Sequence, residues 1–366
     1  MIFDKRLVKD FDKALLVITF ILCLGGVLML HSATQAKGLI FIESYVFRQI
    51  NWIVLAAAFL LIVINISYQK FIDISYALYA INIVLLMLVL ILGRERLGAQ
   101  RWFTVGNFAF QPSEFIKINF ILTLANLLGS KKGRLEDAKM FFIPLVLLAI
   151  PFLLVLVQPD LGTALLLIPI FLAMAYVGGM RVKHLLILVI IGISALPFFW
   201  HFLKDYQKQR LLVFLNPNAD PLGAGYTIIQ SKIAVGSGGL TGKGWLAGTQ
   251  NQLNFLPERH TDFIFSVIGE EWGLFGALIL ILLYFLITRR GFDIVSSTND
   301  MYGKLVAVGI VVLISLQVVI NIAMTIGLMP VVGIPLPLVS YGGSSMLATF
   351  IAIGLLLNIG MRRSRF

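Results

Sequence analysis

The sequence predicts an all-α fold: a polytopic integral membrane helical bundle of about ten transmembrane helices with one long extracytoplasmic loop. Hydrophobic residues make up 59% of the 366 residues and charged residues only 13%, and the mean hydropathy is +0.95. Because soluble domains carry about 25% charged residues, a soluble globular domain is excluded. Long apolar runs recur along the whole chain, as expected of segments whose solvent is lipid.

The apolar runs define the expected spans in chain order. The second, fourth and tenth runs are short, and we expect them to extend into their polar flanks. Residues 1–366 are expected to form a single integral membrane domain. The ten runs are Ala14–Leu30, Ile50–Ile66, Tyr76–Leu92, Phe115–Leu128, Phe141–Val157, Leu161–Val177, Leu185–Leu203, Phe263–Thr288, Leu305–Met324 and Met346–Ile359.

The distribution of basic residues predicts the orientation. The first run follows a basic segment as in a signal peptide, but it is long for one and no clear A-x-A site follows it, so we interpret it as an uncleaved span. Basic residues gather in alternate short connections, which places both termini in the cytoplasm and loop 204–262 outside. Those on the inner side include Lys5, Arg6, Lys9, Lys13, Lys131, Lys132, Arg134, Arg362, Arg363 and Arg365.

Several other classes of site are excluded by composition and spacing. Cys23 is the single cysteine, so no intramolecular disulfide can form, and the four scattered histidines lack the spacing of a zinc site. The basic residues follow membrane topology, which argues against nucleic acid as a partner. "GSGGLTGKG" resembles a phosphate loop but has Ser237 and Gly244 at positions where that motif needs other residues. No organic cofactor is expected.

The long loop is expected to hold short helices. "DYQKQRLLVFLNP" (205–217) and "GYTIIQSKIAV" (225–235) mix aliphatic and polar residues at helical spacing, which suits helices lying in the membrane interface. The glycines after the second segment are expected to let the backbone pack closely at the membrane surface.

Charged residues cluster where the loop meets the eighth span. "FLPERHTDFIF" places Glu258, Arg259, His260 and Asp262 immediately before an apolar run. Asp262 alone fits a helix N-cap. Four polar side chains exceed what capping needs, and polar groups gathered at a membrane-facing mouth favour a functional site.

Three further segments carry candidate polar residues. Glu114 and Lys117 in "QPSEFIK" share a helix face at i, i+3 and fit either a neutralising ion pair or the lining of a polar cavity. Asp160 in "VQPDLGT" fits a helix cap in an outside turn. "PLPLVSYGGSS", with Ser340, fits either an anion-binding helix start or a plain turn.

Together these motifs resemble the SEDS family (shape, elongation, division and sporulation). The resemblance rests on "QRWF", "QPSE", "QPDLGT", "DPLGAGYTIIQSKIAVGSGGLTGKGWLAGTQ", "FLPERHTDFIF" and "PLPLVSYGGSS", and is nearest to the RodA branch. It implies a peptidoglycan glycosyltransferase that polymerises lipid II into β1→4 glycan strands outside the bacterial cytoplasmic (inner) membrane during elongation. Undecaprenyl pyrophosphate would be released in a single inverting displacement.

The resemblance also implies roles for residues and partners. Asp262 matches the essential aspartate, as either a general base or the ligand of a divalent cation (Mg²⁺ or Mn²⁺). A class B penicillin-binding protein (a single-span transpeptidase) and other elongation-complex proteins are the implied partners. Small residues in or near the ninth span (Gly303, Gly309, Ala323 and Gly327) and Gly354 in the tenth fit either contact with the transpeptidase's single span or internal packing of the bundle. The remaining candidates for binding substrate or lining a cavity are Glu114, Lys117, Glu258, Arg259, His260, Asp160, Arg101, Lys243 and Ser340.

Two rival interpretations remain. A lipid II flippase would use the same polar groups but needs access from both membrane faces, whereas the polar cluster lies in the outer half. A non-catalytic scaffold of the wall-elongation machinery would have no need of Asp262.

Overall fold

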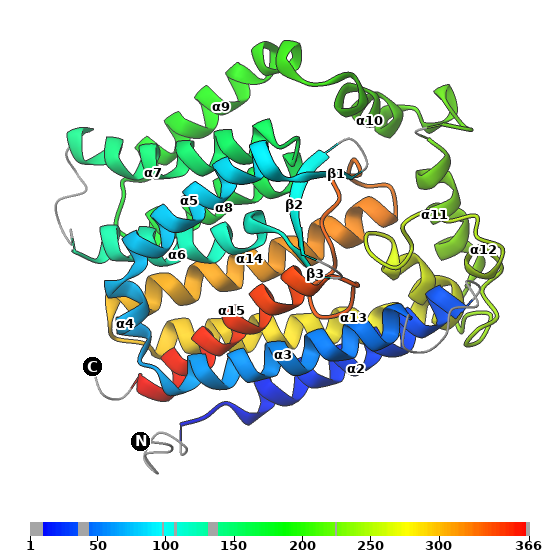
Figure 1. The fold of residues 1–366 in the computed structure, drawn as a ribbon, viewed down its shortest axis with the longest axis horizontal. Helices are drawn as coiled ribbons and strands as arrows, with labels where there is room; N and C mark the ends of the chain where they lie inside the picture. The colour runs from blue at the N-terminus through cyan, green and yellow to red at the C-terminus, as the bar shows by residue number, and fades with distance from the viewer. Residues whose placement is uncertain are drawn as a thin grey trace.

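The computed structural model describes residues 10–35, 44–96, 99–105, 108–130, 138–223 and 225–363. Long, roughly parallel helices form a bundle, and short helices gather at one end of it (Figure 1). The long helices are α2 (Lys13–Thr34), α3 (Tyr45–Asn65), α5 (Ser75–Leu92), α6 (Pro112–Ser130), α7 (Ala138–Val157), α8 (Leu161–Val177), α9 (Val182–Phe202), α13 (Ile264–Ser297), α14 (Met301–Thr325) and α15 (Gly343–Arg362). The short helices are α4 (Tyr68–Asp73), α10 (Asp205–Leu215), η3 (Pro217–Ala219), α11 (Tyr226–Ser237) and α12 (Thr249–Gln252).

The long helices confirm the predicted bundle. Each apolar run coincides with one long helix, and the second, fourth and tenth do extend into their polar flanks. Within the described ranges, six helices are long and apolar enough to cross a membrane, namely α2, α3, α5, α13, α14 and α15, and shorter apolar helices lie at 142–157, 161–177 and 182–195. The protein is therefore a multi-pass membrane protein. The helices expected in loop 204–262 are also present, as α10 and α11.

A small antiparallel sheet between α5 and α6 was not predicted. It consists of β1 (Arg94–Arg96), β2 (Ala99–Val105) and β3 (Phe108–Phe110) in the order β1-β2-β3, with Arg94 opposite Trp102 and Phe103 opposite Phe110. The sequence signal is a run of aromatic and β-branched residues in 102–110. It is short beside the apolar runs on either side, which dominate the hydropathy profile.

The core of the bundle is built around α14, which packs against α6, α8, α13 and α15. Gly309 allows this approach: a Cβ there would lie 2.7 Å from Ile121 of α6 and 2.8 Å from Met174 of α8. Gly354 of α15 similarly faces Val63 of α3. Gly309 and Gly354 therefore pack the bundle internally, as the second interpretation of these glycines expects, and the location of a partner's contact stays a prediction.

Helix α13 is interrupted near its N-terminal end. Gly273 has φ 63° and ψ −157°, a conformation open essentially only to glycine. After this break, the backbone N–H groups of Leu274 and Phe275 donate to the carbonyls of Gly239 and Leu240, at 2.9 and 3.1 Å. A continuous helix would instead use the carbonyls one turn earlier.

The glycine-rich loop after α11 fills this break. The carbonyls of Glu270 and Glu271, freed by the interruption, accept from the N–H groups of Lys243 and Gly244, both at 3.0 Å. Gly242 has φ +81°, and a Cβ on it would lie 2.1 Å from the Glu271 carbonyl oxygen. The expectation that these glycines serve close backbone packing is confirmed.

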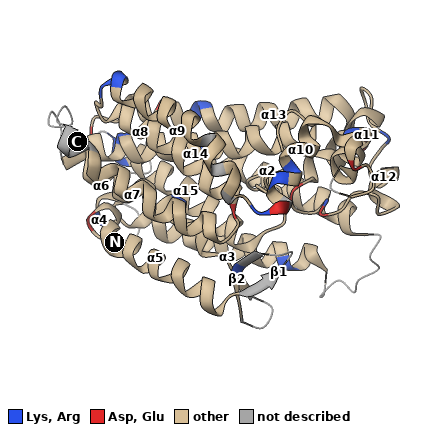
Figure 2. Ribbon diagram, turned by 90° about the horizontal axis from the view of Figure 1, so that it is seen from above, with Lys and Arg blue, Asp and Glu red and all other residues tan. Residues whose placement is uncertain are grey.

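The two ends of the bundle differ in content. The start of α2 and the end of α15 lie at one end, and α10, α11 and α12 lie at the other (Figure 1). Figure 2 shows few charged residues along the middle of the helices. The basic residues at positions 5–9, 131–134 and 365 lie outside the described residues, and the predicted orientation remains a prediction.

Candidate active site

Asp262 lies in the turn that leads into α13, and it is not the cap of that helix. The N-cap position is Phe263, and no side chain supplies a capping hydrogen bond. Glu258, with φ 48°, forms the turn, because its carbonyl accepts from the N–H groups of Thr261 and Asp262, each at 3.1 Å. Asn321 of α14 fixes the far side by donating to the Asp262 carbonyl at 2.9 Å. The capping interpretation is therefore wrong.

The Asp262 carboxylate is available for chemistry. It is partly exposed, and within the described part of the chain no hydrogen bond or ion pair engages it. By contrast, Glu114, Asp160 and Glu270 each have a basic partner. Gly333 faces this carboxylate: a Cβ there would lie 3.5 Å from Asp262 Oδ2.

The surroundings of Asp262 alter its acidity. Its pKa is raised from 3.8 to about 6, mainly because burial removes water from the carboxylate. The carboxylates of Glu258 and, more weakly, Asp160 act in the same direction, whereas the guanidinium groups of Arg210 and Arg101 lower the pKa. A carboxylate with this pKa is largely ionised at neutral pH and matches a general base better than an ordinary aspartate does.

Arg101 and Asp160 form a second polar group beside this turn. Strand β2 carries Arg101 over the turn before α8, where Arg101 Nη1 lies 3.6 Å from Asp160 Oδ1. Arg101 Nε donates to the Gln158 carbonyl at 3.0 Å, and Nη2 donates to the Pro159 carbonyl. Asp160 also caps α8 by accepting from the Thr163 N–H at 3.2 Å. The predicted cap is confirmed, and it carries an ion pair as well.

Segment 331–333 joins these groups into one site. Gly333 faces Asp262, and Gly162, at the start of α8, packs against the Val332 carbonyl, where a Cβ would lie 2.7 Å away. Arg210 of α10 reaches the same segment by donating from Nη1 to the Val331 carbonyl at 3.3 Å. Asp262, Asp160 and two arginines from distant elements therefore meet around one short segment.

Arg210 is the residue that sequence reasoning missed. It lies in α10, which periodicity identifies as a helix, but nothing in its spacing to other motifs indicates which side chain faces Asp262. The folded structure identifies Arg210, because α10 lies beside segment 331–333 and Arg210 donates to the Val331 carbonyl.

Three other predicted site residues make contacts within the chain. Arg259 donates from Nε to the Ala33 carbonyl at 2.6 Å, and burial lowers the pKa of its guanidinium. Lys243 Nζ lies 2.8 Å from Glu270 Oε1. Ser340 Oγ donates to the Thr261 carbonyl at 2.5 Å. In this structure these polar groups fasten the site, and their binding of substrate stays a prediction.

His260 and Glu258 occupy the outer rim of the turn. The His260 ring lies 4.8 Å from that of Tyr45 and 6.0 Å from that of Tyr341, measured between centroids. The N–H of Tyr341 also donates to the His260 carbonyl at 2.9 Å. Glu258 is exposed. The "PLPLVSYGGSS" segment therefore packs on the "ERHTD" turn, as neighbours in space but not in sequence.

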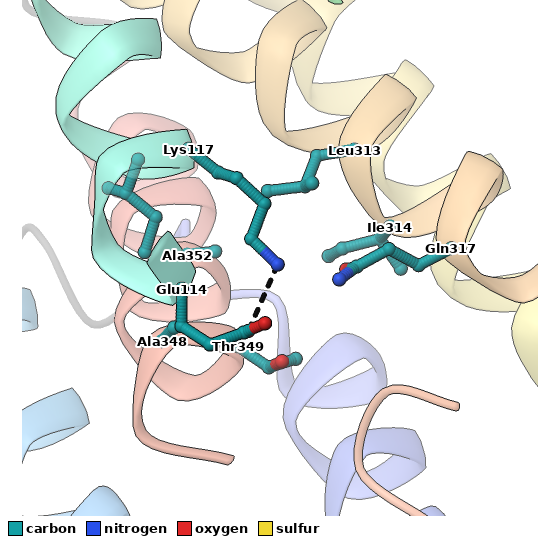
Figure 3. A pocket seen from close by; sticks show the side chains of 9 residues that line it. Glu114, Lys117, Leu313, Ile314, Gln317, Ala348, Thr349 and Ala352 are labelled. Atoms are coloured by element: carbon teal, nitrogen blue, oxygen red, sulfur yellow. Dashed lines mark hydrogen bonds and ion pairs between the residues drawn. The ribbon is translucent and has the colours of Figure 1, made fainter. Parts of the chain in front are cut away.

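Glu114 and Lys117 form a separate buried site. Lys117 Nζ lies 2.9 Å from Glu114 Oε2, and both side chains are almost fully buried. They line a cavity with Gln317 of α14 and Thr349 of α15, and the cavity has room for about one water molecule. Figure 3 shows the pair facing those two helices. The predicted ion pair and the predicted polar cavity are thus both present.

A divalent cation fits this site only together with substrate. Among the described residues, no three His, Cys, Asp or Glu side chains gather closely enough to hold a metal. Mg²⁺ usually needs only one or two carboxylates when substrate phosphates supply further ligands. Asp262, with Glu258 beside it, meets that smaller requirement.

Comparisons with known proteins match nearly the whole length of this chain. The family model FTSW_RODA_SPOVE, described as cell cycle protein, matches residues 13–365. Peptidoglycan glycosyltransferase MrdB of Escherichia coli K12 is 41% identical over 354 residues, covering 96% of this chain and 94% of that protein. Peptidoglycan glycosyltransferase RodA of Treponema pallidum is 35% identical, covering 98% of this chain and 99% of its own length.

Solved structures of similar proteins also superpose on nearly the whole chain. A chain from a peptidoglycan synthase complex, described for the coordination of polymerization and crosslinking, superposes with a TM-score of 0.83 at 33% identity, covering 97% of this chain and 99% of that one. The rod shape determining protein RodA of Thermus thermophilus superposes with a TM-score of 0.72 at 30% identity, covering 96% and 97%.

Proposed function

Because this chain belongs to the FTSW_RODA_SPOVE family, we propose that it polymerises lipid II at the outer surface of the cytoplasmic membrane with Asp262 as its central catalytic residue. The chain is a peptidoglycan glycosyltransferase, the activity for which its relatives MrdB and RodA are named. The observation that carries the role of Asp262 is its unpaired, partly exposed carboxylate beside two arginines.

The proposed reaction needs a base on one side and positive charge on the other. A sugar hydroxyl of one lipid-linked substrate attacks the anomeric carbon of another. The bond from that carbon to the diphosphate breaks, and polyprenyl diphosphate leaves with the bonding electrons. A single displacement of an α-linked donor gives the β1→4 bond. The diphosphate is a good leaving group, so a strong general acid is not needed.

The residues of the site match these demands. The Asp262 carboxylate accepts the proton of the attacking hydroxyl, and a pKa of about 6 leaves it ionised at neutral pH. Arg101 and Arg210 supply positive charge for the departing phosphate oxygens. A Mg²⁺ or Mn²⁺ ion bound with the substrate through Asp262 would supply further charge stabilisation there.

The test is polymerisation of lipid II by purified protein carrying Asp262→Asn. The change keeps the size of the side chain but removes its basicity, and we expect glycan synthesis to fall by about 10²- to 10⁴-fold. Asp220→Asn is the matched control: the same change in the same loop, at a carboxylate already bonded to Gln209 and the Gly223 N–H. Near wild-type synthesis by Asp262→Asn would refute the proposed role.

The outer location of the site rests on the orientation predicted from charge. Helices α10 to α12 lie at the end of the bundle opposite the start of α2 (Figure 1), and Arg210 of α10 contacts the segment that faces Asp262. Leu222 is 90% exposed, so the variant Leu222→Cys should react with a membrane-impermeant maleimide in intact cells whose outer membrane has been permeabilised. Labelling only after lysis would reverse the orientation.

A class B penicillin-binding protein is the proposed partner. Support comes from the likeness to a chain of a complex that couples polymerization to crosslinking. A single-span transpeptidase tethered beside the polymerase would meet each new strand at raised effective concentration. Co-purification from membranes tests this partnership, and a polymerase isolated without any transpeptidase under mild detergent would contradict it.

A further inference from the structure

Two adjacent carboxylates are buried near the N-terminal end of α13. Glu270 is 0% exposed and Glu271 is 1% exposed, two turns below Asp262 and directly before the break at Gly273. Neither has a part in the reaction described above. Both point into contacts with the loop that follows α11.

Glu270 gathers four donors from this loop. Lys243 Nζ lies 2.8 Å from Oε1, and the Thr249 hydroxyl donates to the same oxygen at 3.1 Å. The backbone N–H groups of Gln250 and Asn251 add bonds of 2.9 and 3.2 Å. One carboxylate thereby fixes the start of α12.

Glu271 ties the same loop to α2. It accepts from the Ser32 hydroxyl of α2, from Asn251 Nδ2 at 3.2 Å and from the Leu246 N–H at 3.3 Å. Asn251 Nδ2 also donates to the Ser32 carbonyl at 3.1 Å. We call Glu270, Glu271 and loop 242–252 the carboxylate clasp.

Stability alone does not explain the clasp. Taking carboxylates out of water is costly, and apolar side chains of similar volume often stabilise a fold as well or better. Hydrogen bonds in fixed directions, however, define one arrangement of the loop, which apolar packing specifies less sharply. The clasp therefore suits a segment whose position matters more than its burial.

The segment held in this way carries Asp262. Residues 252–263 run from the end of α12 to the start of α13. Asn251, directly before this segment, is bonded to Glu270 and Glu271, which lie shortly after it in α13, so the clasp anchors both ends of the segment. We propose that Glu270 and Glu271 are positioning residues for Asp262, holding its segment against residues 331–333. The inference rests on the catalytic role proposed for Asp262.

Other contacts keep this segment folded when the clasp is weakened. Arg259 remains bonded to the Ala33 carbonyl, Ser340 to the Thr261 carbonyl and Asn321 to the Asp262 carbonyl. Loss of the clasp should therefore widen the range of positions open to Asp262 without detaching it. A displacement of about 1 Å is enough to lower a rate by about 100-fold.

Two variants weaken the clasp by different routes. Glu270→Gln replaces an acceptor by an amide whose NH₂ faces existing donors. Gly248→Ala keeps both carboxylates but places a Cβ 2.8 Å from Glu270 Oε2. Asp300→Asn is the control, an acid-to-amide change at a carboxylate that binds Tyr68 and caps α14 at the opposite end of the bundle.

The variants are compared by lipid II polymerisation kinetics and by a distance measurement. Spin labels at Phe255→Cys and Leu328→Cys, both exposed positions, are introduced with Cys23→Ala to report the position of segment 252–263. We expect both clasp variants to lower kcat by about 10- to 100-fold, with KM within about threefold, and to broaden the distance distribution. Asp300→Asn should do neither.

The outcomes separate this inference from the proposed function. Unchanged kcat in the clasp variants, or a lower kcat with an unbroadened distribution, would overturn the positioning role. If one variant does not fold, the other variant decides between these outcomes. Activity of Asp262→Asn in the same assay would instead overturn the catalytic role on which the inference rests.

Discussion

The carboxylates of Glu114 and Asp262 have opposite surroundings. Glu114 is paired with Lys117 at 2.9 Å inside the bundle, whereas Asp262 lacks a hydrogen-bonding or ionic partner among the described residues and has a pKa of about 6. A paired carboxylate stabilises its surroundings but is held in place by its partner. An unpaired one costs stability and stays available to a substrate. The difference marks the Asp262 turn as the reactive site.

The largest effect on stability should come from breaking the Glu114–Lys117 pair. Lys117→Met leaves an uncompensated charge at a fully buried position, and we expect it to lower the free energy of unfolding by about 3–5 kcal/mol. The double variant Glu114→Gln/Lys117→Met should recover most of this loss. Thermal unfolding in detergent provides the measurement, and strictly additive effects would show that the two side chains are not coupled.

Asp262→Asn should instead raise the free energy of unfolding. A folded-state pKa of about 6 against 3.8 means that folding favours the protonated acid. That contribution to stability is complete below pH 3.8 and is lost as the pH rises through 6. The neutral amide avoids this loss, so the variant should be more stable than wild type by about 2–3 kcal/mol at pH 7.

The pH dependence provides the check on this prediction. The stability gained by Asp262→Asn should shrink below pH 6 and vanish near pH 4. Equal or lower stability at pH 7 would show that Asp262 is paired in solution and would remove the contrast with Glu114.

Gly333→Ala should reduce glycan synthesis in addition to lowering stability. Gly333 has φ +73°, so alanine there should cost about 1–2 kcal/mol, and its Cβ would narrow the space beside Asp262 Oδ2. Gly179→Ala is the matched control, because φ is +90° and the space around it is open. Both variants should lose stability, but only Gly333→Ala should reduce glycan synthesis.

The smallest expected effect is a shift of the pH profile in Arg210→Gln. Arg210 lowers the pKa of Asp262, so its removal should raise that pKa by up to about one unit. Synthesis by wild-type protein should fall as the pH drops through about 6, and the variant should lose activity at a higher pH. An unshifted acid limb would show that Arg210 does not act on Asp262.

Hydropathy and motif order determined the larger features of this protein. The helical bundle, the short helices of the long loop, the Glu114–Lys117 pair and the candidate Asp262 all follow from local periodicity and residue type. These are properties of neighbours in sequence, and lipid as solvent enforces helices wherever an apolar run is long enough.

Only the tertiary structure decided which polar side chains meet. Arg210, Arg101 and Gly333 come from α10, β2 and the segment before α15, and no spacing in the sequence relates them to Asp262. The same holds for Gly309 of α14, which packs inward because α6 and α8 lie beside it, and for Lys243, which binds Glu270 of α13 from the loop after α11. Contacts between distant segments depend on how helices pack, which side-chain shape over the whole core determines.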